Sequence, residues 1–353
     1  MKRFVRASGS MSKRPTIVDL AREAGVSVAT VDRALNKRHA VREDTTRRVV
    51  TAAEAIGYYA TGLLRQRLNE AAAQRTLGFL LQKHGDDFYQ ALAADLVAAT
   101  QESTAIRGRP IVEFMDELVP SIIAARLREV GAKADALAVV AVDHPHVNAA
   151  VEELRGKGKP VFALLSDITT PARAGYLGID SRKAGRTAGW TIARIARKPG
   201  KIGILLGSHR YLGQQLAEIS FRTYLREHAP EFQPLEPIVN LDDQRIAYEA
   251  TVDLLASNAD LVGIYAAGGG MEGMIRALRD EHAGNRIVAV CNELIPDTRA
   301  ALIDGVIDLV IATPTRPLAA RTVELMAAAL ADPAGRTMRQ VVLPAELYIS
   351  ENL

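Results

Sequence analysis

Residues 16–36 read TIVDLAREAGVSVATVDRALN and contain two short helical patterns separated by a glycine. Thr16 precedes apolar residues at helical spacing, which predicts a helix that begins with an N-cap. Gly25 ends this helix, and Ser27 caps a second helix over residues 28–35. The stripe that the second helix would bury comprises Val31, Ala34 and Leu35. A helix, a tight turn with glycine and a second helix form the arrangement that sets the second helix into the major groove of DNA.

A third helix is predicted over residues 45–56, where apolar side chains again recur at helical spacing and would close a small core. On the second helix, Arg33 would be exposed and could donate two hydrogen bonds to a guanine, while Val28 and Ala29 could contact a thymine methyl group. A three-helix dimerisation bundle would show the same periodicity as a DNA-binding head. The charge of the segment distinguishes these two interpretations.

The charge of the chain is divided unevenly. The net charge of the 353 residues is +3, but residues 1–75 hold fifteen Lys and Arg against seven Asp and Glu, a net charge of +8. The rest of the chain therefore carries −5. A basic module on a mildly acidic body predicts a polyanionic partner for the module alone, although a solvated basic tail would have the same composition.

Composition excludes several classes of protein. With 48% hydrophobic and 24% charged residues, the chain is neither disordered nor collagenous. A single cysteine, Cys291, excludes an internal disulfide framework. No apolar run is long enough to span a membrane, and the basic start lacks the apolar region of a secretory signal. We therefore expect a cytoplasmic protein that does not contact a membrane.

The run quoted above, together with TTRRVVTAAEAIGY at residues 45–58, resembles the DNA-binding head of the LacI (lactose repressor) family. The resemblance implies a helix-turn-helix domain over residues 12–59, after an N-terminal extension at 1–11, and two copies on a pseudo-palindromic operator. It places Val28 and Ala29 at the two main base-reading positions. The residues of the head expected to contact DNA are Thr16, Ser27, Val28, Ala29, Thr30, Arg33 and Arg47. Asp32 stands where the family commonly has Ser, and we expect it to pair with a basic neighbour.

A hinge or linker is expected over residues 60–75. The family usually has Pro-Asn-x-x-Ala-Arg-x-Leu here, with the Leu wedged into the minor groove, whereas this chain reads ATGLLRQR from Ala60. Arg65 matches the family Arg, and Arg67 stands at the wedge position. We expect both to contact DNA; whether this hinge forms a minor-groove helix stays open.

From residue 76 onward, short apolar strands alternate with helical patterns, which predicts parallel sheets covered by helices on both faces. The number of alternating strand and helix units favours two doubly wound lobes over a single sheet. The turn near residues 176–180 is the expected first crossover between them. The predicted strands are 77–81, 111–115, 136–142, 160–165, 201–207, 261–267, 286–291 and 308–314.

Open sheets of this kind bind ligands beyond the carboxyl ends of their strands. Polar and aromatic side chains follow the predicted strands here, including Asp86 and Thr313, and they suit a polyhydroxylated ligand. The residues expected to bind it are Asp87, Phe88, Tyr89, Asp143, His144, Ser166, Asp167, Asp180, Arg182, His209, Arg210, Asn292 and Glu293. Any single one could instead be a loop cap or a solvated group.

Residues 76–353 resemble the type I periplasmic-binding-protein-like effector domain that follows this head in the family, in segments such as FALLSDI (162–168) and GYLGIDSRKAGRTAG (175–189). The resemblance places six residues at or near effector contacts: Phe88, Asp143, Asp167, Asp180, Arg182 and Asn292. It implies a homodimeric or tetrameric repressor whose operator affinity responds to a sugar, polyol or sugar acid. Ala217 and Thr313 replace a frequent Arg and Gln, so the ligand should bind differently from the best-known sugars of the family.

Two alternatives remain open. Gly268, Gly270 and Gly273 form GxGxxG between a strand and a helix, with Glu293 twenty residues on, which would fit a nucleotide-sensing repressor. A solute-binding protein or enzyme with a basic tail is the other. We expect a regulator and not an enzyme, with no catalytic residue and no cofactor. We also expect no metal site, because His144-Pro145-His146 lacks a third ligand.

Overall fold

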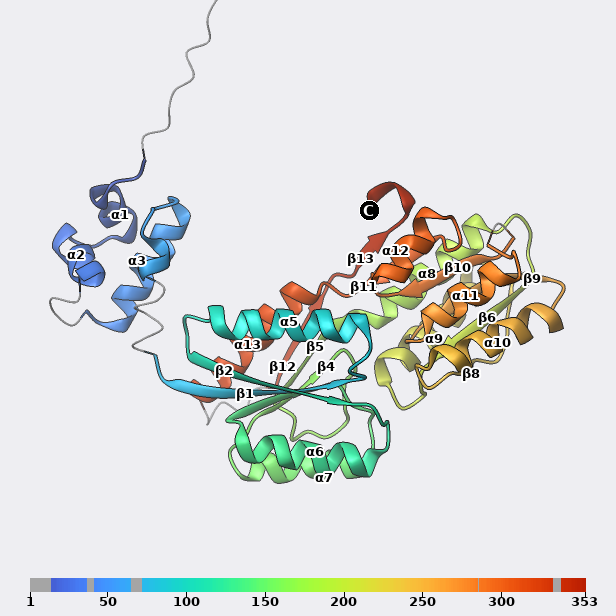
Figure 1. Cartoon of the computed structure of the whole chain (residues 1–353), viewed down its shortest axis with the longest axis horizontal. Helices are drawn as coiled ribbons and strands as arrows, with labels where there is room; N and C mark the ends of the chain where they lie inside the picture. The colour runs from blue at the N-terminus through green and yellow to red at the C-terminus, as the bar shows by residue number, and fades with distance from the viewer. Residues whose placement is uncertain (1–13, 37–40, 65–71, 285, 333–337) are drawn as a thin grey trace, which may run out of the picture. The chain divides into compact units, whose positions relative to one another are not determined.

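The computed structural model describes residues 14–36, 41–64, 72–284, 286–332 and 338–353 (Figure 1). Contacts between Cα atoms divide the chain into two compact units. One unit comprises Met1–Gln74 and Ser103–Arg107, and the other comprises Arg75–Glu102 and Gly108–Leu353.

The first unit contains a head of three helices, α1 (Ile17–Ala24), α2 (Val28–Asn36) and α3 (Glu43–Ala55), as the sequence predicts. Thr16 caps α1, since its hydroxyl accepts the N–H of Asp19 and the Asp19 carboxylate accepts the N–H of Thr16 at 2.9 Å. The N-cap expected at Thr16 is therefore confirmed.

The turn between α1 and α2 depends on Gly25, which has the left-handed φ of +63°. Arg48 of α3 donates to the carbonyl oxygens of Ala24, at 2.7 Å, and of Gly25, at 3.2 Å, so it ties the turn to the third helix. The expected stripe of α2 is buried. Leu64, from the short helical segment at 61–64, is also fully buried in this core.

The second unit is built on two sheets. The first sheet has the strand order β12-β5-β4-β3-β1-β2. Its strands are β1 (Gln74–Gln82), β2 (Arg107–Met115), β3 (Ala136–Val139), β4 (Val161–Leu164), β5 (Gly175–Ile179) and β12 (Arg339–Leu343). The second sheet has the order β13-β11-β10-β9-β6-β7, with β8 also paired to β6. Its strands are β6 (Lys201–Leu206), β7 (Gln233–Pro234), β8 (Ile238–Val239), β9 (Leu261–Ala266), β10 (Val288–Asn292), β11 (Leu309–Ala312) and β13 (Glu346–Tyr348).

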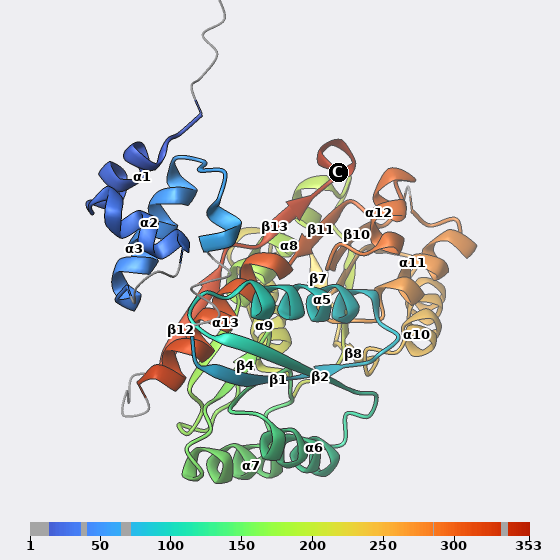
Figure 2. The ribbon, with the colours of Figure 1, turned by 60° about the vertical axis from the view of Figure 1, so that its left-hand side comes forward.

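Each sheet with its helices forms one lobe. Helices α5 (Asp87–Glu102) and α13 (Thr315–Ala331) cover one face of the first sheet, and α6 (Pro120–Lys133) and α7 (Pro145–Gly156) cover the other (Figures 1 and 2). The remaining helices belong to the second lobe: α8 (Ser181–Ile195), α9 (Leu212–His228), α10 (Gln244–Ser257), α11 (Met271–Asp280) and α12 (Pro296–Ile303). A 3-10 turn, η1 (Ser350–Asn352), follows β13. Each lobe has its own buried core.

The chain crosses between the lobes after β5, after β11 and after β12. The first crossover lies where the sequence predicts it, but residues 175–179 form strand β5 and not a turn. Gly175 and Gly178 weaken the strand pattern in the sequence. A Cβ atom at Gly175 would lie 2.2 Å from the carbonyl oxygen of Arg339, so glycine is needed there for β12 to approach. The two predicted doubly wound lobes are confirmed.

The eight predicted strands all form, with ends that shift by a few residues. The strands that the pattern misses are β5 and the short or late segments β7, β8, β12 and β13. Within the described ranges, no helix is both long and apolar enough to cross a bilayer.

We expect Gly25→Ala to destabilise the head by about 1–2 kcal/mol, because an L-residue resists the left-handed conformation. The added Cβ would also lie 2.9 Å from Nη2 of Arg48 and displace that anchor. Hydrogen exchange of the amides of α1 and α2 should speed up about 5- to 30-fold. Gly62→Ala is the matched control, since nothing lies within 4 Å of its Cβ position. Equal exchange in both variants would contradict this role of the turn.

Candidate functional site

The outer face of α2 is open to solvent, as a recognition helix requires. Val28 is 41% exposed, and Ala29 and Arg33 are exposed as well. The Ser27 hydroxyl accepts the N–H of Thr30 at 3.1 Å and so caps the helix. Arg33 donates from Nε to the carbonyl oxygen of Ala29 at 3.1 Å and from Nη2 to the Thr30 hydroxyl at 3.3 Å. Its guanidinium group therefore lies along the exposed side of α2.

Other residues of the head selected from the sequence have mixed placements. Thr16 and Arg47 are exposed, and the Thr16 hydroxyl also serves the helix cap. The basic partner expected for Asp32 is replaced by an amide, because Nδ2 of Asn36 donates to the Asp32 carboxylate at 2.6 Å. Arg65 and Arg67 lie outside the described residues.

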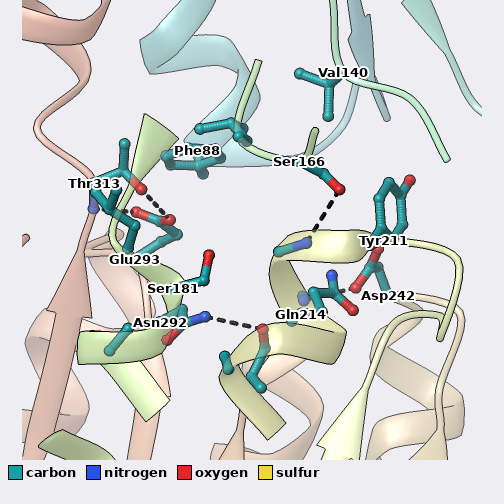
Figure 3. A pocket seen from close by; sticks show the side chains of 18 of the residues that line it. Phe88, Val140, Ser166, Ser181, Tyr211, Gln214, Asp242, Asn292, Glu293 and Thr313 are labelled. Carbon is teal, nitrogen blue, oxygen red and sulfur yellow. Dashed lines mark hydrogen bonds between the residues drawn. The ribbon is translucent and has the colours of Figure 1, made fainter. Parts of the chain in front are cut away.

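A pocket with an empty volume of about 860 Å³, part of it open to solvent, lies among strand ends and loops of both lobes (Figure 3). Polar and aromatic residues make up much of its lining: Asp86, Phe88, Tyr89, Ser166, Ser181, Tyr211, Gln214, Asp242, Asn292, Glu293 and Thr313. Apolar residues such as Val140 and Met271 complete the wall.

Asp86 lines the pocket from the first lobe. It follows the loop after β1 and accepts the N–H groups of Phe88 at 3.0 Å and Tyr89 at 3.3 Å, so it caps the start of α5. The rings of Phe88 and Tyr89 meet edge to face with centroids 5.2 Å apart. Burial raises the pKa of the Asp86 carboxyl group above its usual value.

Glu293 follows β10 and lies beside Thr313, which follows β11. Its carboxylate accepts the backbone N–H of Thr313 at 2.8 Å and the Thr313 hydroxyl at 2.7 Å (Figure 3). Burial raises the pKa of Glu293 to about 7, against the two hydrogen bonds, which lower it. The nearby Asp86 carboxylate adds to the rise.

Asp242 supplies a third carboxylate, from the loop after β8. It accepts the N–H of Gly269 at 2.7 Å, and burial raises its pKa. Lys83 of the first lobe donates to the backbone carbonyl oxygens of Leu241, at 3.0 Å, and of Asp242, at 2.6 Å. This lysine therefore joins the two lobes beside the pocket.

Backbone strain gathers around the pocket. In the described part of the chain, the residues other than glycine with positive φ are Lys83, Leu165, Leu241, Asp242, Glu293 and His282. All but His282 line the pocket or take part in the Lys83 contact beside it. Each such residue costs about 1 kcal/mol or more, and strain of this kind persists mainly where function requires the geometry.

Two buried polar atoms of the pocket lack a partner among the described residues: Oη of Tyr211 and Oδ1 of Asn292. Nδ2 of Asn292 donates to the carbonyl oxygen of Ala267 at 3.0 Å, which fixes the amide and leaves its oxygen unsatisfied. An unpaired buried polar group costs about 1–3 kcal/mol. A ligand with hydroxyl groups would satisfy both atoms.

Five residues selected from the sequence line this pocket: Phe88, Tyr89, Ser166, Asn292 and Glu293. The other eight lie outside the lining of this pocket: Asp87, Asp143, His144, Asp167, Asp180, Arg182, His209 and Arg210. Among these, Asp87, Arg182, His209 and Arg210 are exposed.

Local hydrogen bonds hold the remaining four selected residues outside the pocket lining. The Asp143 carboxylate accepts the N–H of Thr169 at 2.9 Å. Asp167 forms an ion pair of 2.6 Å with Arg173. Asp180 caps α8, and His144 caps α7 through the N–H of His146. Residues that follow a strand reach the correct edge of the sheet, but local caps decide which way they turn.

Four further residues line the pocket although the sequence pattern does not predict them: Ser181, Tyr211, Gln214 and Asp242. Tyr211 directly follows His209 and Arg210, which the sequence does predict, so its aromatic ring could have been included with them. Asp242 follows a strand of two residues, which leaves no readable pattern.

The glycines of the GxGxxG run have a packing role. A Cβ atom at Gly273 would lie 1.9 Å from the carbonyl oxygen of Gln244, so glycine lets α11 pack on α10. Cβ atoms at Gly268 and Gly269 would each lie 2.9 Å from the Asp242 side chain. No group of three His, Cys, Asp or Glu side chains that could hold a metal occurs in the described residues.

Comparison with known families accounts for both units. Residues 16–60 match the family of bacterial regulatory proteins named after lacI, and residues 77–334 match the periplasmic binding protein domain. The chain belongs to the lacI family. It is a transcriptional regulator with a helix-turn-helix head and a periplasmic-binding-protein-like body.

Similar proteins agree with this assignment. The HTH-type transcriptional regulator RegA of Clostridium saccharobutylicum is 40% identical over 74 residues, which are 21% of this chain and 22% of RegA. The regulator GalS of Salmonella typhimurium is 26% identical over 270 residues, 75% of each chain. A solute-binding protein of an ABC transporter from Agrobacterium vitis, solved with bound α-D-tagatopyranose, has the same fold, with a TM-score of 0.72 and 19% identity over 79% of this chain and 95% of that one.

Glu293 predicts a pH dependence of stability. Its pKa is raised to about 7 in the folded protein, so its contribution to the free energy of unfolding is complete below the unfolded pKa, near 4.5, and is lost as the pH rises through 7. In the unchanged protein, Glu293 should lower the free energy of unfolding by on the order of 3 kcal/mol between about pH 5 and pH 8, and Glu293→Gln should abolish this decrease. Asp86 and Asp242 contribute in the same direction. Urea unfolding at several pH values tests this, with exposed Glu231→Gln as the control; parallel pH profiles for both variants would contradict it.

Proposed function

We propose that this regulator is a repressor that binds a pseudo-palindromic operator as a homodimer or tetramer in the cytoplasm, and that a small sugar or polyol in the pocket changes its operator affinity. The observation that carries the ligand proposal is the pair of unsatisfied buried atoms, Oη of Tyr211 and Oδ1 of Asn292, in a cavity lined by carboxylates and aromatic rings. Hydroxyl groups donate and accept hydrogen bonds, and sugar faces pack on rings. The tagatopyranose bound by the solute-binding protein of similar fold supports this class of ligand.

The charge of the pocket argues against a sugar acid, which is one of the three expected classes of effector, and against the alternative of a nucleotide. Among its described lining residues there is no Lys or Arg, while Asp86, Asp242 and Glu293 provide three carboxyl groups. The carboxylate of a sugar acid or the phosphates of a nucleotide would meet like charge without a compensating cation. The glycines of the GxGxxG run serve packing against Asp242 and α10, which removes the main reason for a nucleotide.

A binding role also fits better than an enzymatic one. The relatives RegA and GalS are named as transcriptional regulators. The raised pKa values in the pocket follow from burial, which a ligand-binding site requires as much as a catalytic one does.

The proposed mechanism uses the two lobes as the responsive element. A ligand held by residues of both lobes favours one relative position of the lobes over another. The contact from Lys83 to the loop of Leu241 and Asp242 would then change with the lobe position. Two heads that follow their bodies would alter the spacing of the recognition helices on the operator.

A thermal-shift screen of the full chain tests the ligand class. We expect stabilisation by members of a panel of sugars and polyols, and none by sugar acids or NADH. Tyr211→Phe should weaken the binding of the best ligand about 5- to 100-fold, because the ligand loses the hydrogen bond to the Tyr211 hydroxyl. Tyr348→Phe is the matched control, since its hydroxyl binds Glu346 away from the pocket. Stabilisation by NADH alone, or equal effects of the two variants, would contradict the proposal.

Arg33→Ala tests the DNA-binding face. We expect it to cost about 1–3 kcal/mol of specific operator binding and to relax the preference at one base pair, as a base contact requires. Footprinting on a selected operator and a binding-site selection measure both effects. Arg126→Ala, on an exposed part of the body, should leave binding unchanged. A uniform loss on all sequences would assign Arg33 to a phosphate, and no protection of any palindrome would contradict the operator proposal.

A further inference from the structure

The pocket contains more negative charge than a neutral sugar needs. We propose that the effector carries a protonated amine together with its hydroxyl groups, as an amino sugar or an aminated polyol does. This inference rests on the proposed ligand-binding role and narrows the class of ligand.

The three carboxyl groups reach the pocket from separate segments. Asp86 precedes α5 in the first lobe, Asp242 lies after β8, and Glu293 lies after β10. Their hydrogen-bond partners in the described residues are neutral, namely backbone N–H groups, the Gln214 side chain and the Thr313 hydroxyl. A ligand atom between the segments would have carboxylate oxygens on more than one side.

No cation of the described chain forms an ion pair with these carboxylates. The positive charge of nearby Lys83 acts to lower the pKa values of Asp86 and Asp242. However, its ammonium group donates to the backbone carbonyl oxygens of Leu241 and Asp242 and does not line the pocket. Arg245 and Arg276 line a neighbouring pocket that Asp86 and Asp242 also line, together with three further carboxyl groups, but neither arginine lines the pocket proposed for the ligand. On the side of the proposed ligand, the described lining residues therefore supply three carboxyl groups and no cation.

Burial increases the cost of leaving these carboxyl groups ionised without a cation. Desolvation raises the pKa values of Asp86, Asp242 and Glu293 alike, so the empty pocket disfavours their ionised forms. An ammonium group would restore a paired, hydrogen-bonded arrangement that a hydroxyl group cannot supply. Glu272, in the first turn of α11, adds negative charge near Asp86.

A separate observation points to a ligand at the same place. Tyr211 is only 3% exposed, lines the pocket and has no partner for its hydroxyl among the described residues. The aromatic rings of Phe88, Tyr89 and Tyr211 belong to the same lining. Aromatic faces attract cations, particularly when both are removed from water.

A metal ion would be the simplest other cation, but the described residues offer no group of three metal-ligating side chains. An anionic ligand would be repelled by the carboxylates. A neutral sugar satisfies Tyr211 and Asn292 but leaves the carboxyl groups without a counter-charge. The protonated amine is the ligand group that uses all of these features.

Calorimetry on the full chain with matched ligand pairs tests the proposal. The pairs are D-glucosamine and D-glucose, D-galactosamine and D-galactose, D-mannosamine and D-mannose, and an aminocyclitol and myo-inositol, each near pH 7. We expect at least one amine to bind about tenfold or more tightly than its hydroxyl counterpart, and the N-acetyl form to lose that gain. A neutral member that binds as tightly as its amine, or a sugar acid that binds more tightly, would overturn the inference and leave the proposed sugar-binding role standing. Binding by no member of any pair would count against both proposals.

Charge variants assign the preference to the pocket. Asp242→Asn and Glu293→Gln should each reduce the ratio of amine to hydroxyl affinity several-fold while the neutral partner still binds. Asp253→Asn, on the exposed side of α10, should leave the ratio unchanged. If either pocket variant fails to fold by circular dichroism, the other carries the test. An unchanged ratio in a folded pocket variant would overturn the proposal.

Discussion

Two parallel strands that lie side by side can be joined only by a segment that crosses the face of the sheet, and this constraint brings the carboxyl ends of the strands to one edge. The body of this protein contains two such sheets, and three crossovers join them. Residues far apart in the sequence, such as Phe88, Ser166 and Asn292, therefore line one pocket. Glycine at position 175 makes the arrangement possible, because it admits the late strand β12 at the edge of the first sheet.

Desolvation gives that pocket its chemical character. The carboxyl groups of Asp86, Asp242 and Glu293 are held by backbone N–H groups, the Gln214 side chain and a hydroxyl, and none forms an ion pair among the described residues. Burial raises the pKa values of all three. Left-handed backbone at Asp242 and Glu293 adds strain at the same place. A site that is unsatisfied when empty gives a ligand with matching groups a high affinity. The size of any allosteric response is limited by the difference between the ligand's affinities for the two lobe positions.

The sequence predicts the fold well because both of its parts follow simple periodic patterns. The cap at Thr16, the glycine turn at Gly25 and the alternation of strands and helices each have a local cause. The pocket is predicted less completely. Asp143 and Asp180 lie beyond strand ends, close to where Asn292 ends β10, but their side chains accept nearby backbone N–H groups instead of lining the pocket. The direction of such a side chain depends on neighbours that only the folded chain brings together.

If the protein acts as proposed, the ligand in the pocket and the operator at the head are thermodynamically coupled. The most direct measurement is the operator dissociation constant, by fluorescence anisotropy, with and without a saturating ligand, alongside the ligand dissociation constant, by calorimetry, with and without operator. Linkage requires the two ratios to be equal, and the account predicts a factor on the order of 5 to 150. A ligand that binds the pocket, as shown by its loss of affinity in Tyr211→Phe, yet leaves operator affinity unchanged would contradict it.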